Sequence, residues 1–156
     1  MKKLSKILVI SLLALVIVIA LAACGGGAPG YINNPPEKPA DLVTQLKADG
    51  WEVFDTTNDD GFAMITGYKY SYDKEKEDEL EDTDKVTEEI VIVFYLDDED
   101  AAKAYKKVWE ILIDYGKKDL PNGVSFSYSV SQKGKTVSIY MSLTGLYGDV
   151  DSSLFF

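Results

Sequence analysis

Carboxylates are nearly the only side chains in this chain that could do chemistry. The 156 residues include 26 aspartates and glutamates, but no histidine, no arginine and a single cysteine, Cys24. Histidine is the commonest general base and metal ligand, and arginine is the residue that clamps phosphate or carboxylate with two hydrogen bonds. A single cysteine excludes an internal disulfide. Two suitably spaced carboxylates can still hydrolyse a glycosidic bond, so a hydrolase that uses carboxylates stays open.

The densest group of carboxylates lies in residues 73–89, where ten of them are interspersed with three lysines. A calcium loop arranges oxygen ligands around a sharp glycine turn. This run contains no glycine and no Asp-x-Asp-x-Asp-Gly pattern. We therefore predict a solvated connection between two strands, and cation binding by the run stays an open alternative. Residues 58–61 are likewise predicted to form a turn, and residues 97–100 to cap a helix, rather than to bind metal.

Serine recurs at every second position from Ser125 to Ser131, and again at Ser138 and Ser142. A serine hydroxyl beside a lysine such as Lys133 could act as a nucleophile. Serines with period two are more typical of the polar face of a strand. Such a face contacts water, or it binds extended peptides or glycans. We assign no catalytic, metal-binding or cofactor-binding residue from the sequence.

The first 24 residues carry the most specific motif in the chain. Three lysines within the first six residues precede seventeen uncharged residues, and the sequence Leu21-Ala22-Ala23-Cys24 closes this segment. The pattern resembles a bacterial lipoprotein signal peptide over residues 1–23, with its lipobox at the end. The resemblance implies cleavage before Cys24, attachment of diacylglycerol and palmitate to that residue, and anchoring on the extracytoplasmic face of the cell membrane. Several acyl chains are needed for stable anchoring, because one acyl chain alone binds a membrane only marginally. The alternative is an uncleaved signal-anchor helix, for which seventeen residues is at the short end.

Beyond Cys24 the chain is strongly acidic. All 26 carboxylates but only 13 lysines follow this residue, which gives a formal charge of −13. Such a charge argues against nucleic acid as a partner and against direct binding to anionic lipids. We expect a non-catalytic binding or interaction module of the cell envelope, held on the membrane through the lipid on Cys24, with an envelope protein or glycan as its partner. The alternative is a small envelope hydrolase that uses Asp and Glu carboxylates.

Composition divides the rest of the chain into two parts. Residues 24–39 are rich in glycine and proline, and we predict that they form a tether between the lipid and the domain. Residues 40–156 carry the periodic apolar patterns. These 117 residues are enough for one hydrophobic core, so we predict a single α+β domain.

Two helices are predicted in this domain. A short helix begins near Pro39 and ends before Gly50, and Trp51 is expected to pack back on Leu46 in a Schellman motif. A longer helix spans residues 98–115, with acidic residues at its start and Gly116 at its end. We expect its core-facing stripe to be the apolar set at helical spacing, Ala101, Ala104, Tyr105, Val108, Leu112 and Tyr115.

Five strands complete the domain. The first three are predicted at residues 51–54, 62–72 and 90–96, and the continuous apolar sequence of the third is typical of a central strand covered on both faces. The last two form a hairpin of residues 124–131 and 137–143. The order αβββ-αββ predicts a two-layer α+β sandwich, in which both helices pack on one face of a five-stranded antiparallel sheet. The other face would carry the serines, Lys69 and Tyr140, and the apolar residues 154–156 would dock on the domain.

Overall fold

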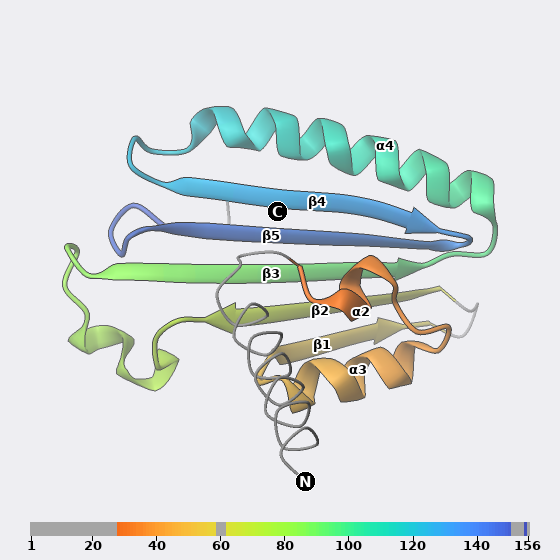
Figure 1. Ribbon diagram of the computed structural model, residues 1–156, viewed down its shortest axis with the longest axis horizontal. Coiled ribbons are helices and arrows are strands. Elements are labelled where there is room, and N and C mark those ends of the chain that lie inside the picture. Colours follow the sequence, from red (N-terminus) through yellow and green to blue (C-terminus); the bar gives the residue numbers. More distant parts are fainter. Residues whose placement is uncertain (1–27, 59–61, 151–154, 156) are drawn as a thin grey trace, which may run out of the picture.

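A computed structural model describes residues 28–58, 62–150 and 155 (Figure 1). Along the chain the elements are α2 (Gly30–Asn33), α3 (Pro39–Ala48), β1 (Glu52–Thr57), β2 (Ala63–Tyr70), the 3₁₀ helix η1 (Lys74–Glu79), β3 (Lys85–Tyr95), α4 (Glu99–Gly116), the 3₁₀ helix η2 (Lys117–Asp119), β4 (Ser125–Lys133) and β5 (Thr136–Leu146). Both predicted helices and all five predicted strands are present, although β1 and β3 are longer than predicted. Cys24 and the predicted signal peptide lie outside the described residues, as do residues 59–61 of the predicted turn.

The five strands form one antiparallel sheet in the order β1-β2-β3-β5-β4. The central strand, β3, pairs with β2 on one side and with β5 on the other. Every residue of β3 from Ile90 to Tyr95 is buried, and alternate residues belong to two different hydrophobic clusters. The α+β class, the five-stranded antiparallel sheet and a central strand covered on both faces are therefore confirmed.

The short helix α3 has the ends that the sequence predicts. Pro39 is its first residue, where a missing N–H leaves no hydrogen bond unmade. At its other end Gly50 has a φ of +80°, which suits glycine because it has no Cβ. The N–H of Trp51 donates to the carbonyl of Leu46 at 3.0 Å, and that of Gly50 to Lys47 at 3.2 Å. The Schellman motif is confirmed, and the buried Trp51 shares a cluster with Leu46.

The helices α3 and α4 cover opposite faces of the sheet, so the prediction that both helices lie on one face is wrong. On the face that presents Ile65 and Val93, which we call the α3 face, α3 packs over β1 and β2. On the face that presents Phe94 and Ile139, the α4 face, α4 packs over β4 and β5. In Figure 1 the two helices accordingly lie near opposite edges of the sheet. The helices α3 and α4 thus cover different halves of the sheet on opposite faces, and the short helix α2 adds a contact with β5 on the α3 face.

The register of the sheet explains this change of face. Ile65 of β2 lies opposite Val93 of β3, which lies opposite Ser138 of β5. The apolar side of β2 therefore continues into the serine-bearing side of β5 and β4. The serines, Lys69 and Tyr140 do share one face, as predicted, but it is the face that α3 also occupies.

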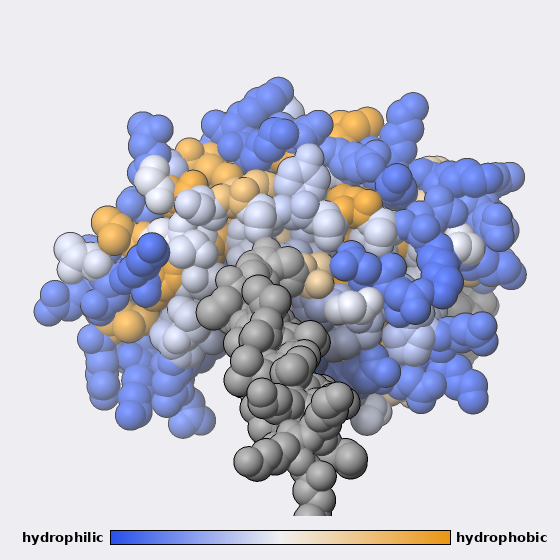
Figure 2. Space-filling model, in the orientation of Figure 1, coloured by the Kyte–Doolittle hydropathy of each residue, from blue (hydrophilic) through white to orange (hydrophobic). Residues whose placement is uncertain are grey.

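The helix α4 begins as predicted but is rotated about its axis relative to the prediction. The side chain of Asp98 accepts a hydrogen bond from the N–H of Ala101 at 2.7 Å, which confirms the predicted cap. The predicted core-facing stripe is mostly exposed. The buried residues of α4 are instead Ala102, Ile113 and Gly116. The small residues Ala102 and Gly116 let the helix lie close to the strands. Figure 2 shows separate hydrophobic residues between hydrophilic ones near the upper edge of the molecule, where α4 lies.

The segment before α3 packs on the domain, so the prediction of a free tether over residues 24–39 is wrong for residues 28–39. Ile32 of α2 is 1% exposed and belongs to the cluster on the α3 face, and Ala28 and Tyr31 pack against that cluster. The hydroxyl of Tyr95 donates to the carbonyl of Pro36 at 3.0 Å. An apolar residue within a Gly- and Pro-rich segment is enough to dock the segment, because burying one isoleucine contributes about 1.5–3 kcal/mol. The packed domain therefore begins at or before Ala28, not at residue 40.

The end of the chain returns to the α4 face. Phe155 is buried and stacks on Phe126 of β4 with the ring centroids 4.8 Å apart. The predicted docking of residues 154–156 is confirmed for Phe155, and residues 154 and 156 lie outside the described residues.

Candidate functional site

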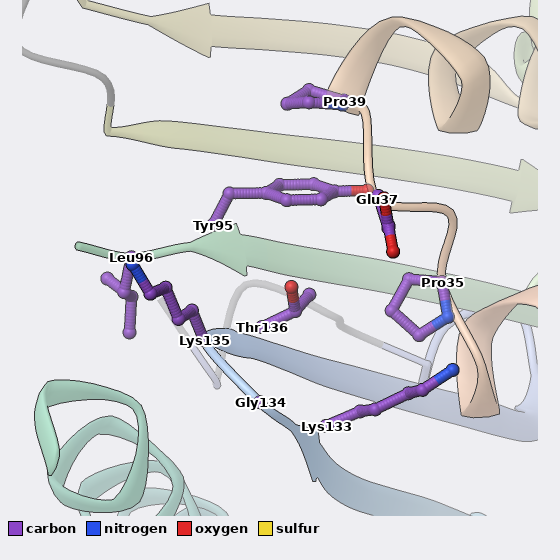
Figure 3. A pocket seen from close by; sticks show the side chains of 9 residues that line it. All are labelled: Pro35, Glu37, Pro39, Tyr95, Leu96, Lys133, Gly134, Lys135 and Thr136. Atoms are coloured by element: carbon purple, nitrogen blue, oxygen red, sulfur yellow. The ribbon is translucent and has the colours of Figure 1, made fainter. Parts of the chain in front are cut away.

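A pocket of about 600 Å³ lies where the end of β3, the β4–β5 hairpin and the segment before α3 meet (Figure 3). It is lined by Pro35, Glu37, Pro39, Tyr95, Leu96, Lys133, Gly134, Lys135 and Thr136. Gly134 adopts a φ of +55° at the tip of the hairpin, and this left-handed conformation turns the chain between the two lysines. The pocket exists because the segment before α3 is packed against the sheet rather than free.

Two hydrogen bonds fix the walls of this pocket. The ammonium of Lys133 donates to the side-chain oxygen of Asn34, which ties the hairpin to the segment after α2. The hydroxyl of Tyr95 donates to the carbonyl of Pro36. Burial, with a smaller contribution from the carboxylate of Asp41, raises the pKa of Tyr95 to about 12, so the phenol stays protonated and remains a donor at neutral pH.

The side chains in the pocket suit binding rather than carboxylate chemistry. Two ammonium groups, one hydroxyl and the faces of proline and tyrosine rings line it, and Glu37 is the one carboxylate among the lining residues. Glycosidase chemistry needs a second carboxylate on the other side of the bond that breaks. The ammonium of Lys133 donates a hydrogen bond to Asn34, so it is not held against Ser129 or Ser131 as serine–lysine catalysis would require.

Residues 73–84 of the acidic run lie in the connection between β2 and β3, and tyrosines hold the run to the sheet. Glu88 and Glu89 belong to β3 instead, and Glu88 is buried, so the prediction of a solvated connection is wrong for the end of the run. The hydroxyl of Tyr72 donates to Glu88 at 3.0 Å and that of Tyr147 donates to Glu77 at 2.7 Å. Burial and then the carboxylate of Glu88 raise the pKa of Tyr72 above its usual value, so Tyr72 remains a donor. Within residues 28–58, 62–150 and 155, no three carboxylates converge closely enough to hold a metal ion.

On the α3 face, fewer serines are exposed than the sequence indicates. The short helix α2 contacts β5, and Ser138 and Tyr140 are buried. The hydroxyl of Tyr140 donates to Glu89, which ties two strands of this face together. Ser125 and Ser127 remain exposed at the outer strand. The open serine surface is therefore confined to β4, with little apolar area to bind a peptide or a glycan.

Among the described residues, the largest group of exposed apolar side chains lies on α4. Five large side chains are 39–69% exposed, namely Tyr105, Val108, Ile111, Leu112 and Tyr115. With Ala101 and Ala104 they follow helical spacing and form one strip along the helix, which we call the α4 stripe. Single exposed apolar residues are ordinary on a protein surface, but a contiguous group is typical of an interaction site.

Sequence reasoning identified the residues of the α4 stripe, except Ile111, but assigned them to the core. The pocket was not predicted, because one of its walls, made by Pro35, Glu37 and Pro39, comes from the segment that the sequence marks as a tether. Cys24 lies outside the described residues, so its role stays a prediction.

Comparison of the chain with protein-family models, with curated proteins and with solved structures yields no match. Among the residues that the structure describes, no helix has both the length and the apolar composition to cross a membrane.

Proposed function

We propose that this chain is a lipid-anchored, non-catalytic interaction module of the bacterial cell envelope, and that α4 is its docking surface for a protein. The lipobox pattern that ends at Cys24 supports the location. The exposed α4 stripe is the observation that carries the interaction role. The domain holds one helix with apolar residues on more than half of its circumference, and only part of that surface is used by its own core.

The α4 stripe is a stronger candidate than the other surfaces. The carboxylates of the acidic connection are mostly exposed, and some of them accept hydrogen bonds from tyrosines or from backbone N–H groups. The exposed serines offer little apolar area. Burying apolar area drives most protein association, at about 25 cal/mol per Å². Of the surfaces described above, the stripe has the greatest number of exposed large apolar side chains.

The location is tested at Cys24. In the bacterial host, Cys24→Ala is expected to abolish incorporation of labelled palmitate and to leave an unprocessed or mislocalised precursor, because the substitution removes the sulfur that receives the lipid. Gly25→Ala, which keeps the thiol, is the matched control and should behave as the unsubstituted chain does. Membrane fractionation and palmitate labelling measure both variants. A Cys24→Ala chain that matures normally and stays on the membrane contradicts the proposed location.

The docking role is tested at Leu112. Brief chemical crosslinking of intact cells should give a covalent complex that contains the chain. Leu112→Ser is expected to reduce that complex strongly, because it places a hydroxyl within the α4 stripe, and the half-exposed Leu112 contributes little to the core. Lys103→Ser changes an exposed residue on the polar side of the same helix and should leave the complex unchanged. An undiminished complex in Leu112→Ser, with both variants melting like the parent chain, argues against docking through α4.

A further inference from the structure

The proposed role of α4 leaves open which protein covers it. Building on that role, we propose that the occupant is a second copy of this chain, and that two α4 helices pair antiparallel about a two-fold axis at Val108. Three features support this assignment: the distribution of charge over the domain, the order of small and large residues in the α4 stripe, and the position of the N-terminal segment.

Charge restricts where two copies can meet. Residues 98–119 carry six carboxylates and five lysines, a formal charge of −1. The other residues after Cys24 carry 20 carboxylates and eight lysines, a formal charge of −12. Two copies of such a chain repel each other over most of their surface, and like charges brought together oppose association. The segment that holds α4 is nearly neutral, so a second copy can approach there with the least repulsion.

The order of residues along the α4 stripe fits an antiparallel pair. Val108 lies midway between Ala101 and Tyr115, and a two-fold axis at Val108 pairs residues whose numbers add up to 216. Ala101 then lies opposite Tyr115 of the second copy, and Ala104 lies opposite Leu112. The third pair joins Tyr105 to Ile111. In the first two pairs a small residue meets a large one, which is how two helices fill the space between them. The third pair joins two large residues, and Tyr105 also contacts Phe94 of its own sheet.

A parallel pair of the same helices is disfavoured by shape and by charge. It would place Ala101 and Ala104 against their own copies at one end and Tyr115 against Tyr115 at the other, which leaves a gap and a crowded contact. It would also bring the acidic residues 98–100 of both copies together. In the antiparallel pair these residues lie near Lys117 and Lys118 of the second copy, and the helix dipoles oppose each other favourably.

The fold directs the α4 stripe away from the lipid. Ala28, the first described residue after Cys24, packs against the cluster on the α3 face. The helix α4 lies on the other side of the sheet, and a sheet and a packed helix lie about 10 Å apart. A membrane surface is therefore the less suitable occupant for the stripe, and the net negative charge of the domain also disfavours contact with anionic lipids.

Single cysteines on the full-length chain in intact cells test this arrangement. Since the thiol of Cys24 carries lipid, Val108→Cys introduces one free thiol, and a short bismaleimide should convert this variant to a product of twice the chain mass. Tyr115→Cys should not react with itself, because two copies of residue 115 are 14 helical positions, or about 21 Å, apart in the antiparallel pair. Ala101→Cys and Tyr115→Cys should react with each other when both are expressed in one cell. Lys103→Cys on the polar side and the unsubstituted chain give the background.

Each outcome decides between the proposals. A doubled mass with Val108→Cys and with the mixed Ala101→Cys and Tyr115→Cys pair supports the antiparallel dimer. Self-reaction of Tyr115→Cys as strong as that of Val108→Cys overturns the antiparallel order. An adduct of Val108→Cys at any other protein mass overturns the dimer but leaves the docking role of α4 standing. Only uncoupled chain in all variants, at background level, overturns both the dimer and the docking role. Lys103, Val108 and Tyr115 are exposed and Ala101 is half-buried, so folding of the cysteine variants is expected to be preserved.

Discussion

Ile32→Ala is expected to lower the free energy of unfolding by about 2–5 kcal/mol, the usual range for truncating a buried isoleucine to alanine. Ile32 is 1% exposed and packs in the same cluster as Leu42, Leu46 and Trp51. Removal of its outer carbons leaves a cavity between α2 and the α3 face of the sheet. Denaturant unfolding of the lipid-free chain, residues 25–156, gives this value directly.

The neighbouring residue provides the control for this prediction. Asn33 also belongs to α2 but is exposed. Asn33→Ala should change the free energy of unfolding by less than about 0.5 kcal/mol, as surface substitutions usually do. Equal and small effects of Ile32→Ala and Asn33→Ala would mean that the segment before α3 is a tether after all, as its glycine and proline content indicates.

The second large effect is expected on the free energy of unfolding when one of two isoleucines on α4 is replaced. Ile113 is fully buried against the sheet, whereas Ile111, two residues earlier, is 59% exposed. Ile113→Ala is expected to lower the free energy of unfolding by about 2–5 kcal/mol. Ile111→Ala should lower it by less than about 0.5 kcal/mol when the protein is dilute enough to be monomeric. Chemical unfolding of the two variants at the same low concentration measures the difference.

The same pair of variants tests the rotation of α4. A helix turned so that the α4 stripe faces the sheet would reverse the order of the two effects. Because a dimer is stabilised by mass action, raising the protein concentration should raise the melting temperature of the parent chain more than that of Ile111→Ala. A larger loss for Ile111→Ala than for Ile113→Ala at low concentration would be incompatible with the described orientation.

The sequence predicts the strands well because their apolar period is local. The alternation of serine with apolar residues in β4 places Phe126 and Ser127 on opposite faces, and the structure has them so. The choice of face for each helix is not local. It depends on the register across β2, β3 and β5, which aligns Ile65 with Ser138 through Val93. The continuous apolar sequence of β3 already indicated two covered faces, and this observation contradicts a sheet with both helices on one side.

The orientation of α4 could not be read from its sequence because its apolar arc is too wide. Large side chains such as Tyr105 and Leu112 define the strongest stripe, but helical packing also depends on close approach. Ala102 and Gly116 provide that approach on the side that faces the sheet. A helix that is apolar on two adjoining sides has two surfaces to bury. Sequence periodicity identifies both surfaces without showing which one the core of the same chain uses.

The candidate sites also differ in whether their sequence signal is local. The proposed lipid attachment at Cys24 is based on a contiguous pattern of a few residues, which can be read directly from a sequence. The pocket between Glu37 and Lys133 joins residues nearly one hundred positions apart, through the docking of Ile32 and the bond from Lys133 to Asn34. No local period signals such a contact. An isoleucine within a Gly- and Pro-rich segment is the one signal that could have indicated it.

Under the proposed anchoring through Cys24, the docking of α2 also limits the distance between the domain and its lipid. Ala28 lies four positions after Cys24. A fully extended chain spans at most about 3.6 Å per residue, so the reach is about 14 Å. The headgroup layer takes up about 5–8 Å of that distance on each side of a bilayer. A domain anchored in the proposed way would sample a thin shell above the membrane rather than the depth of the envelope. Its encounters would then be with molecules that share the same membrane surface, where diffusion in two dimensions brings anchored proteins together at high local concentration.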